Sequence, residues 1–342
     1  MTDTSYKVIR STRASRIGSI IGLILFAILV SYPSWGDRAT MRLLVEMFYI
    51  LALAQMWNLL AGYGGLVSVG QQAFVGLGGY MLFLITIHFG VGPIWTVPLA
   101  GLIGALISLP VAFLVFRLRG HYFAIGTWVV AEVFLLLFAQ VKTLGGGSGM
   151  SLPVSVIKSI SSSRAGRDSA IYWTALLVVI VVIGIVYFLL RSRHGLALTA
   201  IRDSEEASGS LGVDNFRAKL LVYIFAAFGT AAIGALIFLT NLRISPSAAF
   251  DINWTTTVIF IVVIGGIGTI EGPILGTIVY FLLREQLADF GSWYLILLGA
   301  TAVVVMLKAP QGIWGIITHK YDLRFFPVQR RLLLKENDSQ ES

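Results

Sequence analysis

The segment AIYWTALLVVIVVIGIVYFLLRSR, residues 170–193, decides the fold class of this chain. It contains no charged residue before Arg191, and apolar side chains fill nearly every position from Ala170 to Leu190. A helix needs about 20 consecutive, mostly apolar residues to cross the hydrocarbon core of a bilayer. Basic residues collect where such helices leave the membrane on its cytoplasmic side. The segment therefore predicts a transmembrane helix that ends at Arg191 and Arg193.

The composition extends this interpretation to the whole chain. Hydrophobic residues make up 57% of the 342 residues and charged residues only 12%, whereas soluble domains carry about 25% charged residues. The net charge of +8 could suggest nucleic acid, but the basic residues fall at the ends of apolar runs and not on one face of a soluble helix. We therefore expect a lipid bilayer and no nucleic acid as the surroundings. The chain contains no cysteine, which excludes disulfides and thiolate metal sites.

Nine further apolar runs resemble the first in length. They cover residues 17–32, 41–61, 66–89, 93–116, 122–141, 219–241, 254–268, 273–287 and 292–308. The stretch 254–287 could be one long helix, but glycines at 265, 266, 268 and 272 and Pro273 interrupt it, which favours two spans. We predict an all-α, polytopic membrane protein with about ten transmembrane helices.

The distribution of Lys and Arg predicts the orientation. With the N-terminus inside, even-numbered connections return to the cytoplasm, and dense basic clusters should lie there. They follow the fourth, sixth and tenth runs, at Arg117 and Arg119, at Arg191 to Lys219, and at Lys308 to Lys335. The exception is the loop 142–169, which this topology puts outside although it holds four basic residues. We expect a cytoplasmic basic segment 1–16, a transmembrane domain 17–317 with an inner loop 191–218, and a cytoplasmic polar tail 318–342 that is disordered beyond Lys335.

The outer loop begins with the glycine run Gly145, Gly146 and Gly147 and continues into serines 159 and 161–163. Such a run could be taken for a phosphate-binding loop, but it lacks the Gly-Lys-Ser/Thr ending and leads into no helix. We interpret it as a mobile surface loop. Its position would allow contact with a delivered substrate or a docking protein.

The inner loop, RSRHGLALTAIRDSEEASGSLGVDNFRAK at residues 191–219, is polar in the middle of a very apolar protein. Asp203 is suited to cap a helix and has Glu206 three residues later, as in a capping box. Ala207 and Leu211 lie one turn apart on one face, and Gly212 suits the position after a helix end. The loop predicts a short amphipathic helix at the cytoplasmic surface.

The order Glu206, Ala207, Ser208, three residues and Gly212 resembles the Glu-Ala-Ala loop of bacterial ABC-importer permeases. In that family the loop forms the coupling helix that docks into the ATP-binding subunit. Ser208 departs from the second alanine, and Val222, Tyr223 and Ile224 stand where the broad pattern has Ile-x-Leu-Pro. The resemblance makes these residues candidates for coupling to an ATPase: Arg202, Asp203, Glu205, Glu206, Ala207, Leu211 and Gly212.

Four longer segments widen the resemblance to residues 40–315. They are NLLAGYGGLVSVGQQAFVGLGGY (58–80), RLRGHYFAIGTWVVAEV (117–133), AIRDSEEASGSLGVDNFRAKL (200–220) and VIGGIGTIEGPILGTIV (263–279). In sequence and order they are similar to blocks of LivM-type permeases for branched-chain amino acids. The resemblance implies a subunit of the bacterial inner membrane. It also implies a second, LivH-type permease, two ATPases that hold ATP and Mg, and an extracytoplasmic binding protein as partners. It implies no cofactor in this chain.

Polar residues inside the apolar runs are candidates for the translocation pathway, because lipid offers them no hydrogen-bond partner. They are Ser68, Gln71, Gln72, Thr127 and Glu132. A glycine-rich, broken span at 66–80 would suit a substrate site, and tight helix packing explains the same pattern. An ionised Glu132 exposed to lipid would cost about 3 kcal/mol. It must be paired, protonated or face water, where it would suit the ammonium of an amino acid. Glu271 lies in a predicted tight turn, where exposure to solvent explains a charged residue as well as a role in the pathway does.

No enzyme chemistry emerges from the sequence. There is no catalytic triad that can be placed on one side of the membrane, and His88 and His121 have no neighbours at metal-ligand spacing. Three alternatives remain: a permease for urea or short-chain amides, an ion-coupled secondary transporter that uses carboxylates such as Glu132, and a membrane scaffold without transport.

Overall fold

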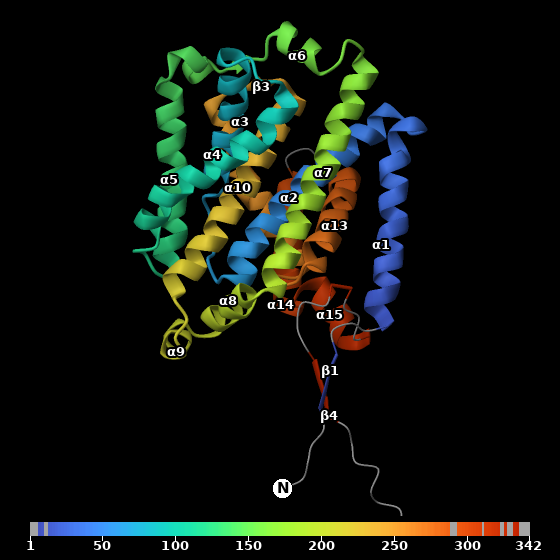
Figure 1. The fold of residues 1–342 in the computed structure, drawn as a ribbon, viewed down its shortest axis with the longest axis vertical. Coiled ribbons are helices and arrows are strands. Elements are labelled where there is room, and N and C mark those ends of the chain that lie inside the picture. Colours follow the sequence, from blue (N-terminus) through green and yellow to red (C-terminus); the bar gives the residue numbers. More distant parts are fainter. Residues whose placement is uncertain are drawn as a thin grey trace, which may run out of the picture.

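The computed structural model describes residues 6–9, 13–287, 293–309, 311–321, 325–326 and 331–334. Helices dominate it (Figure 1). The long helices are α1 (Arg13–Ser31), α2 (Arg38–Asn58), α3 (Gln71–His88), α4 (Pro93–Val115), α5 (His121–Gln140), α7 (Arg164–Arg191), α10 (Asn215–Asn241), α12 (Asn253–Gly265), α13 (Glu271–Leu287) and α14 (Trp293–Lys308). The shorter helices are α6 (Val154–Ile160), α8 (Arg193–Asp203), α9 (Glu205–Ser210), α11 (Pro246–Ala249) and α15 (Gly312–Tyr321).

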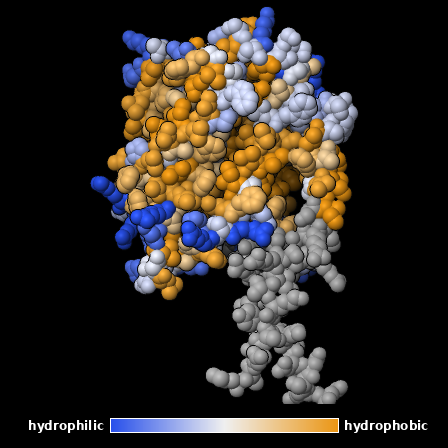
Figure 2. All heavy atoms as spheres, viewed as in Figure 1, coloured by the Kyte–Doolittle hydropathy of each residue, from blue (hydrophilic) through white to orange (hydrophobic). Residues whose placement is uncertain are grey.

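Each of the ten predicted apolar runs overlaps one of these long helices. By length and composition, seven helical segments in the described part could cross a membrane. They are Arg38–Tyr63, Pro93–Val115, His121–Gln140, Arg164–Arg191, Asn215–Asn241, Pro246–Gly265 and Gly299–Tyr321. Figure 2 shows an apolar belt between hydrophilic residues at the two ends of the molecule. The all-α class is confirmed, whereas ten spans and cytoplasmic termini stay predictions.

The core forms where α10 packs against α3 and α4, with α2 beside them. Small residues allow this approach, because packing between membrane helices depends on close backbone contact. A Cβ on Gly78 of α3 would overlap the carbonyl oxygen of Ala231 of α10, and a Cβ on Gly234 of α10 would overlap that of Val75. The two helices therefore leave no room for larger side chains at these crossings.

Between α2 and α3 the chain is not regularly α-helical. A π-helical turn, η2 (Leu59–Tyr63), is followed by irregular backbone at 64–70, and α3 begins only at Gln71. Most of this connection is buried, as irregular backbone at membrane depth must be. The predicted span 66–89 is thus shorter than expected and preceded by a buried break.

The two ends of the bundle differ (Figure 1). The helix α6 lies at one end, and α8, α9 and the terminal strands β1 (Tyr6–Ile9) and β4 (Arg331–Leu334) lie toward the other. The strands β1 and β4 pair antiparallel, with Tyr6 opposite Leu334. Residues 1–5, 10–12 and 335–342 lie outside the described residues, including the tail expected to be disordered. The predicted boundary at 317/318 falls inside α15.

The segment 142–169, which the sequence predicts as a mobile surface loop, contains local secondary structure. The segment forms the 3₁₀ turns η3 (Lys142–Leu144) and η4 (Gly146–Ser148), the strand β2 (Met150–Ser151) and α6. The strand β2 pairs with β3 (Arg243–Ile244), which directly follows α10. A Cβ on Gly149, at φ 73°, would overlap the carbonyl oxygen of Ile244. Gly149 thus allows this segment to pack closely against the residues that follow α10.

Capping explains where several helices begin. The carboxylate of Asp37 accepts a hydrogen bond from the backbone N–H of Thr40 and so caps α2, and this bond lowers the pKa of Asp37. Such a cap satisfies one of the free N–H groups of the first turn.

Candidate functional site

The polar loop 191–218 folds into the end of α7, the helices α8 and α9, and the start of α10. Ser204 caps α9, because its hydroxyl accepts a hydrogen bond from the N–H of Ala207 at 3.3 Å. The prediction that Asp203 is the cap was wrong: Asp203 is the last residue of α8, and its carboxylate pairs with Arg202 at 3.3 Å. Gly212, at φ 83°, follows the end of α9 as predicted.

The surface of α9 is open to solvent on most sides. Glu205, Glu206 and Ala207 are exposed, and the side chain of Leu211, just after the helix, is 82% exposed. Ser208 alone among residues 202–212 is buried. The helix therefore presents two carboxylates and an apolar residue outward while one side chain faces the bundle.

The buried side of α9 is fastened to the first turns of α10. The hydroxyl of Ser208 donates to Oδ1 of Asn215 at 2.9 Å, and Nδ2 of Asn215 donates to the carbonyl oxygen of Glu205 at 2.7 Å. Nζ of Lys219 lies 2.7 Å from Oε2 of Glu205. We call these four residues the α9 clamp. Sequence reasoning missed Asn215 and Lys219, although the replacement of alanine by Ser208 was a signal.

Arg202 is exposed like the other coupling candidates but also contacts the bundle. Its Nη1 donates to the carbonyl oxygen of Gly62 at 3.0 Å, so it joins α8 to the π-helical turn η2. Four of the other predicted coupling residues, Glu205, Glu206, Ala207 and Leu211, are gathered on α9 and its end. Arg202 therefore connects this region to the break between α2 and α3.

The glycine turn between α12 and α13 is hydrogen-bonded to the end of α2, just before the same break. Oδ1 of Asn58 accepts from the N–H of Gly268, and its Nδ2 donates to the carbonyl oxygen of Thr269, both at 2.8 Å. Gln55 donates to the carbonyl oxygen of Ile270 at 2.7 Å. Glu271 is not the solvent-exposed turn residue that the sequence allowed. Its side chain is buried, and its Oε1 accepts hydrogen bonds from the N–H groups of Phe325 and Phe326.

Four of the five pathway candidates are buried inside the bundle. Thr127 of α5 accepts from the N–H of Val69 at 3.1 Å, beside Ser68, whose hydroxyl accepts from the N–H of Gly70. Gln71 donates to Thr230 of α10, and the hydroxyl of Thr255 of α12 donates to Oε1 of Gln72. These side chains join the start of α3 to three neighbouring helices.

Glu132, the fifth candidate, lies elsewhere. It is exposed on α5, and its Oε1 accepts a hydrogen bond from the indole N–H of Trp128, one turn earlier, at 3.1 Å. The structure therefore does not bring the five candidates together. It separates four internal hydrogen-bonding groups from one carboxylate on the surface.

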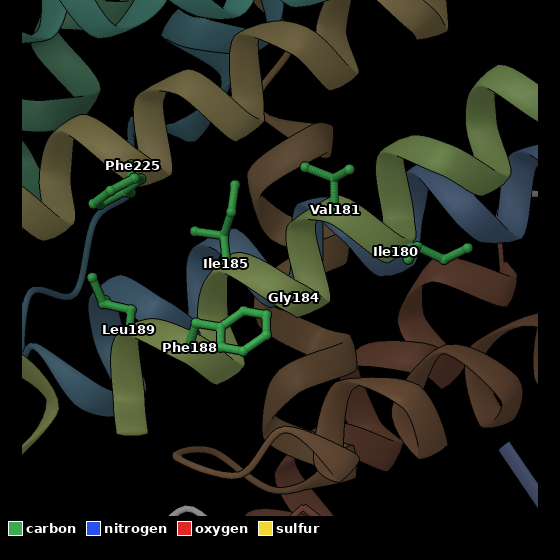
Figure 3. A pocket seen from close by; sticks show the side chains of 7 residues that line it. All are labelled: Ile180, Val181, Gly184, Ile185, Phe188, Leu189 and Phe225. Atoms are coloured by element: carbon green, nitrogen blue, oxygen red, sulfur yellow. The ribbon is translucent and has the colours of Figure 1, made fainter. Parts of the chain in front are cut away.

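A groove of about 510 Å³ opens between α7 and α10, lined by Ile180, Val181, Gly184, Ile185, Phe188, Leu189 and Phe225 (Figure 3). No lining side chain carries a charge or a hydrogen-bonding group, so the groove offers no partner to a polar solute. Within the described ranges, no three His, Asp or Glu residues lie together in a way that could hold a metal ion.

Comparisons with known proteins agree with a transport subunit. Residues 39–306 match the family described as the permease component of branched-chain amino acid transport systems. The chain is 30% identical to the high-affinity branched-chain amino acid transport system permease protein LivM of Escherichia coli, over 86% of this chain and 74% of that protein.

More distant relatives carry other names. The chain is 25% identical to the fructose import permease protein FruG of Bifidobacterium longum, over 80% of this chain and 83% of that protein. It is 21% identical to the probable branched-chain amino acid transport permease protein LivH of Methanocaldococcus jannaschii, over 73% of this chain and 83% of that protein. No solved structure matches the chain. The family match covers most of the chain, and the chain therefore belongs to the family of permease components of branched-chain amino acid transport systems.

Proposed function

We propose that this chain forms, with a second, LivH-type permease, the path through which branched-chain amino acids cross the bacterial inner membrane. Two partner ATPases, which hold ATP and Mg, would drive the transport, and an extracytoplasmic binding protein would deliver the substrate. The observation that carries the coupling step is the α9 clamp, which ties an exposed helix to the helix at the centre of the bundle.

The clamp gives a mechanical route from an ATPase to the membrane domain. An ATPase that holds Glu206 and Leu211 would move α9 when it closes on ATP. The hydrogen bonds and the ion pair would carry this movement to Asn215 and Lys219 on α10, which packs against α3 and α4. Packed helices shift between discrete arrangements, so such a movement would switch the path between outward and inward access.

Variants of α9 test the docking step. Replacement of Glu206 by Lys, or of Gly212 by Leu, should abolish ATP-driven leucine uptake in proteoliposomes and leave the amount of chain in the membrane unchanged. Glu206 is exposed, so loss of packing is not the cause for Glu206→Lys. Gly212 has open space around it but lies at φ 83°, which strains any other residue, so Gly212→Leu acts by distorting the end of α9. Normal uptake by a well-expressed Glu206→Lys variant would disprove the docking role.

A charge swap tests the clamp itself. Glu205→Lys should reduce uptake because it places two cations together, and the double variant Glu205→Lys with Lys219→Glu should restore it. The ATPases should still co-purify with the single variant. Failure of the double variant to recover while the single variant is inactive would contradict transmission through this ion pair.

Competition identifies the substrate class. Unlabelled leucine should suppress uptake of labelled leucine, whereas urea, short-chain amides and fructose should not. Uptake should cease on depletion of ATP and persist with ionophores, because the family match does not favour an ion-coupled transporter. The opposite sensitivity would overturn the ATP-driven mechanism.

A further inference from the structure

The helix α5 lies at the edge of the bundle (Figure 1). Only 17% of its most apolar stretch is buried, against 72% for the spans Arg38–Tyr63 and Asn215–Asn241. Its buried residues, Phe123, Thr127 and Ala131, follow one another at four-residue spacing and so form a single stripe toward α3. Val130, Phe134 and Phe138 pack partly against the core. The exposed side of the helix has no cover among the described residues.

Between the two ends of the helix, where His121 and Gln140 are exposed, the uncovered surface is apolar except at one position. Its large apolar side chains are Tyr122, Ile125, Trp128, Val129, Val133, Leu136 and Leu137. Glu132 lies among them, five residues from Thr127 and so far round the helix from the buried stripe. It is also near the middle of a 20-residue span, where a residue cannot reach the headgroup region as those at helix ends do. We call this surface the α5 face.

The carboxylate of Glu132 is incompletely satisfied. Trp128 supplies one donor to Oε1, whereas an ionised carboxylate has about four acceptor sites. Among the described residues no Lys, Arg or His forms an ion pair with it. Lipid offers no further donors. An ionised Glu132 therefore needs water or another protein chain beside α5.

We propose that the second permease covers the α5 face and encloses with it a water-filled part of the translocation path, where Glu132 binds the ammonium group of the amino acid. This proposal rests on the proposed function, which supplies the second permease and the substrate. The path then runs along the outside of this chain. Ser68, Gln71, Gln72 and Thr127 serve the packing of the bundle and do not line the path.

The absence of native cysteine allows a direct test of water at this face. In the assembled complex, Glu132→Cys should react with a positively charged methanethiosulfonate at least 100-fold faster than Val181→Cys, because only a hydrated thiol ionises. Val181 is the control, since it is exposed on the apolar groove of α7. Lys158→Cys on α6 is the control for full access to water. Leucine should slow the reaction of Glu132→Cys. A rate equal to that of Val181→Cys would overturn the proposal.

Photo-crosslinking tests whether the second permease covers the α5 face. A benzophenone amino acid at Val129 or Leu136 should capture the second permease, identified by the mass of the adduct, and the same group at Val181 should not. Capture at neither α5 position, in a complex from which the second permease co-purifies, would refute the docking surface.

Uptake tests the role of the carboxylate. Glu132→Gln should lower leucine uptake at least tenfold while ATP hydrolysis and co-purification of the partners persist, and Glu132→Asp should retain most uptake. If the wild-type complex transports leucine and Glu132→Gln transports it equally well, Glu132 does not bind the ammonium group, and the proposed function still stands. If the wild-type complex transports urea or fructose and not leucine, the substrate class of the proposed function is wrong, independently of the role of Glu132.

Discussion

At the scale of single residues, two buried amides hold distant parts of the chain together. Asn58 and Gly268 are 210 positions apart in the sequence, yet their side chain and backbone are joined by a hydrogen bond. Asn58 also satisfies the carbonyl oxygen of Thr269, and Gln55 that of Ile270. A glycine turn between two spans thus finds its hydrogen-bond partners on α2, where water is excluded. A buried polar group left without such a partner costs about 1–3 kcal/mol.

Asn58→Ala should therefore lower the melting temperature of the detergent-purified protein by several degrees, because the N–H of Gly268 and the carbonyl of Thr269 both lose their partner. Asn241→Ala is the matched control, since Asn241 is exposed at the end of α10. Thermal unfolding followed by circular dichroism measures the difference. Equal melting temperatures for the two variants would show that the turn is not held by Asn58.

At the scale of elements, α3 and α10 depend on small residues at two reciprocal crossings. Gly78 meets the backbone at Ala231, and Gly234 meets the backbone at Val75. Backbone atoms cannot move aside as the end of a flexible side chain can. The same helices carry the buried polar contact between Gln71 and Thr230. The position of α10 is thus set by glycines.

Gly78→Leu should reduce the amount of chain in the membrane strongly, because the added side chain would force α3 and α10 apart. Gly184→Leu, also in a long helix, should leave the amount unchanged, since a Cβ on Gly184 would meet no atom within 4 Å. Immunoblots of membrane fractions after matched expression give the comparison. Accumulation of Gly78→Leu at the level of Gly184→Leu would contradict this packing.

At the scale of the whole molecule, the two ends of the bundle carry different elements. The exposed helix α9 lies toward one end and α6 lies at the other (Figure 1). The basic clusters predict that the end with α9 faces the cytoplasm. The pairing of β1 with β4 keeps the two terminal segments beside each other.

In intact cells, a membrane-impermeant maleimide should label Lys158→Cys on α6 and should label Leu211→Cys beside α9 only after the inner membrane is opened. Both side chains are exposed, and the absence of native cysteine removes background. The reverse pattern would invert the topology and place α9 out of reach of cytoplasmic ATPases.

The sequence by itself determined the features that depend on neighbouring residues. Runs of apolar residues such as 170–190 predicted the all-α class and the approximate position of the long helices, because every backbone polar group in lipid must be satisfied within the segment. The end of α9 at Gly212 also followed from a local rule, since glycine adopts positive φ without strain. The similarity of several blocks in their order predicted the family.

Only the tertiary structure decided which polar residues meet. The sequence could not show that Ser204 in place of Asp203 caps α9, because both are good caps and the bend between α8 and α9 selects one of them. It could not show that Glu271 is buried while Glu132 is exposed, because burial depends on packing by segments far away in the chain. The α9 clamp, the hydrogen bonds of Asn58 to the glycine turn and the uncovered α5 face all arise from such long-range packing. Periodicity along one helix does not encode it.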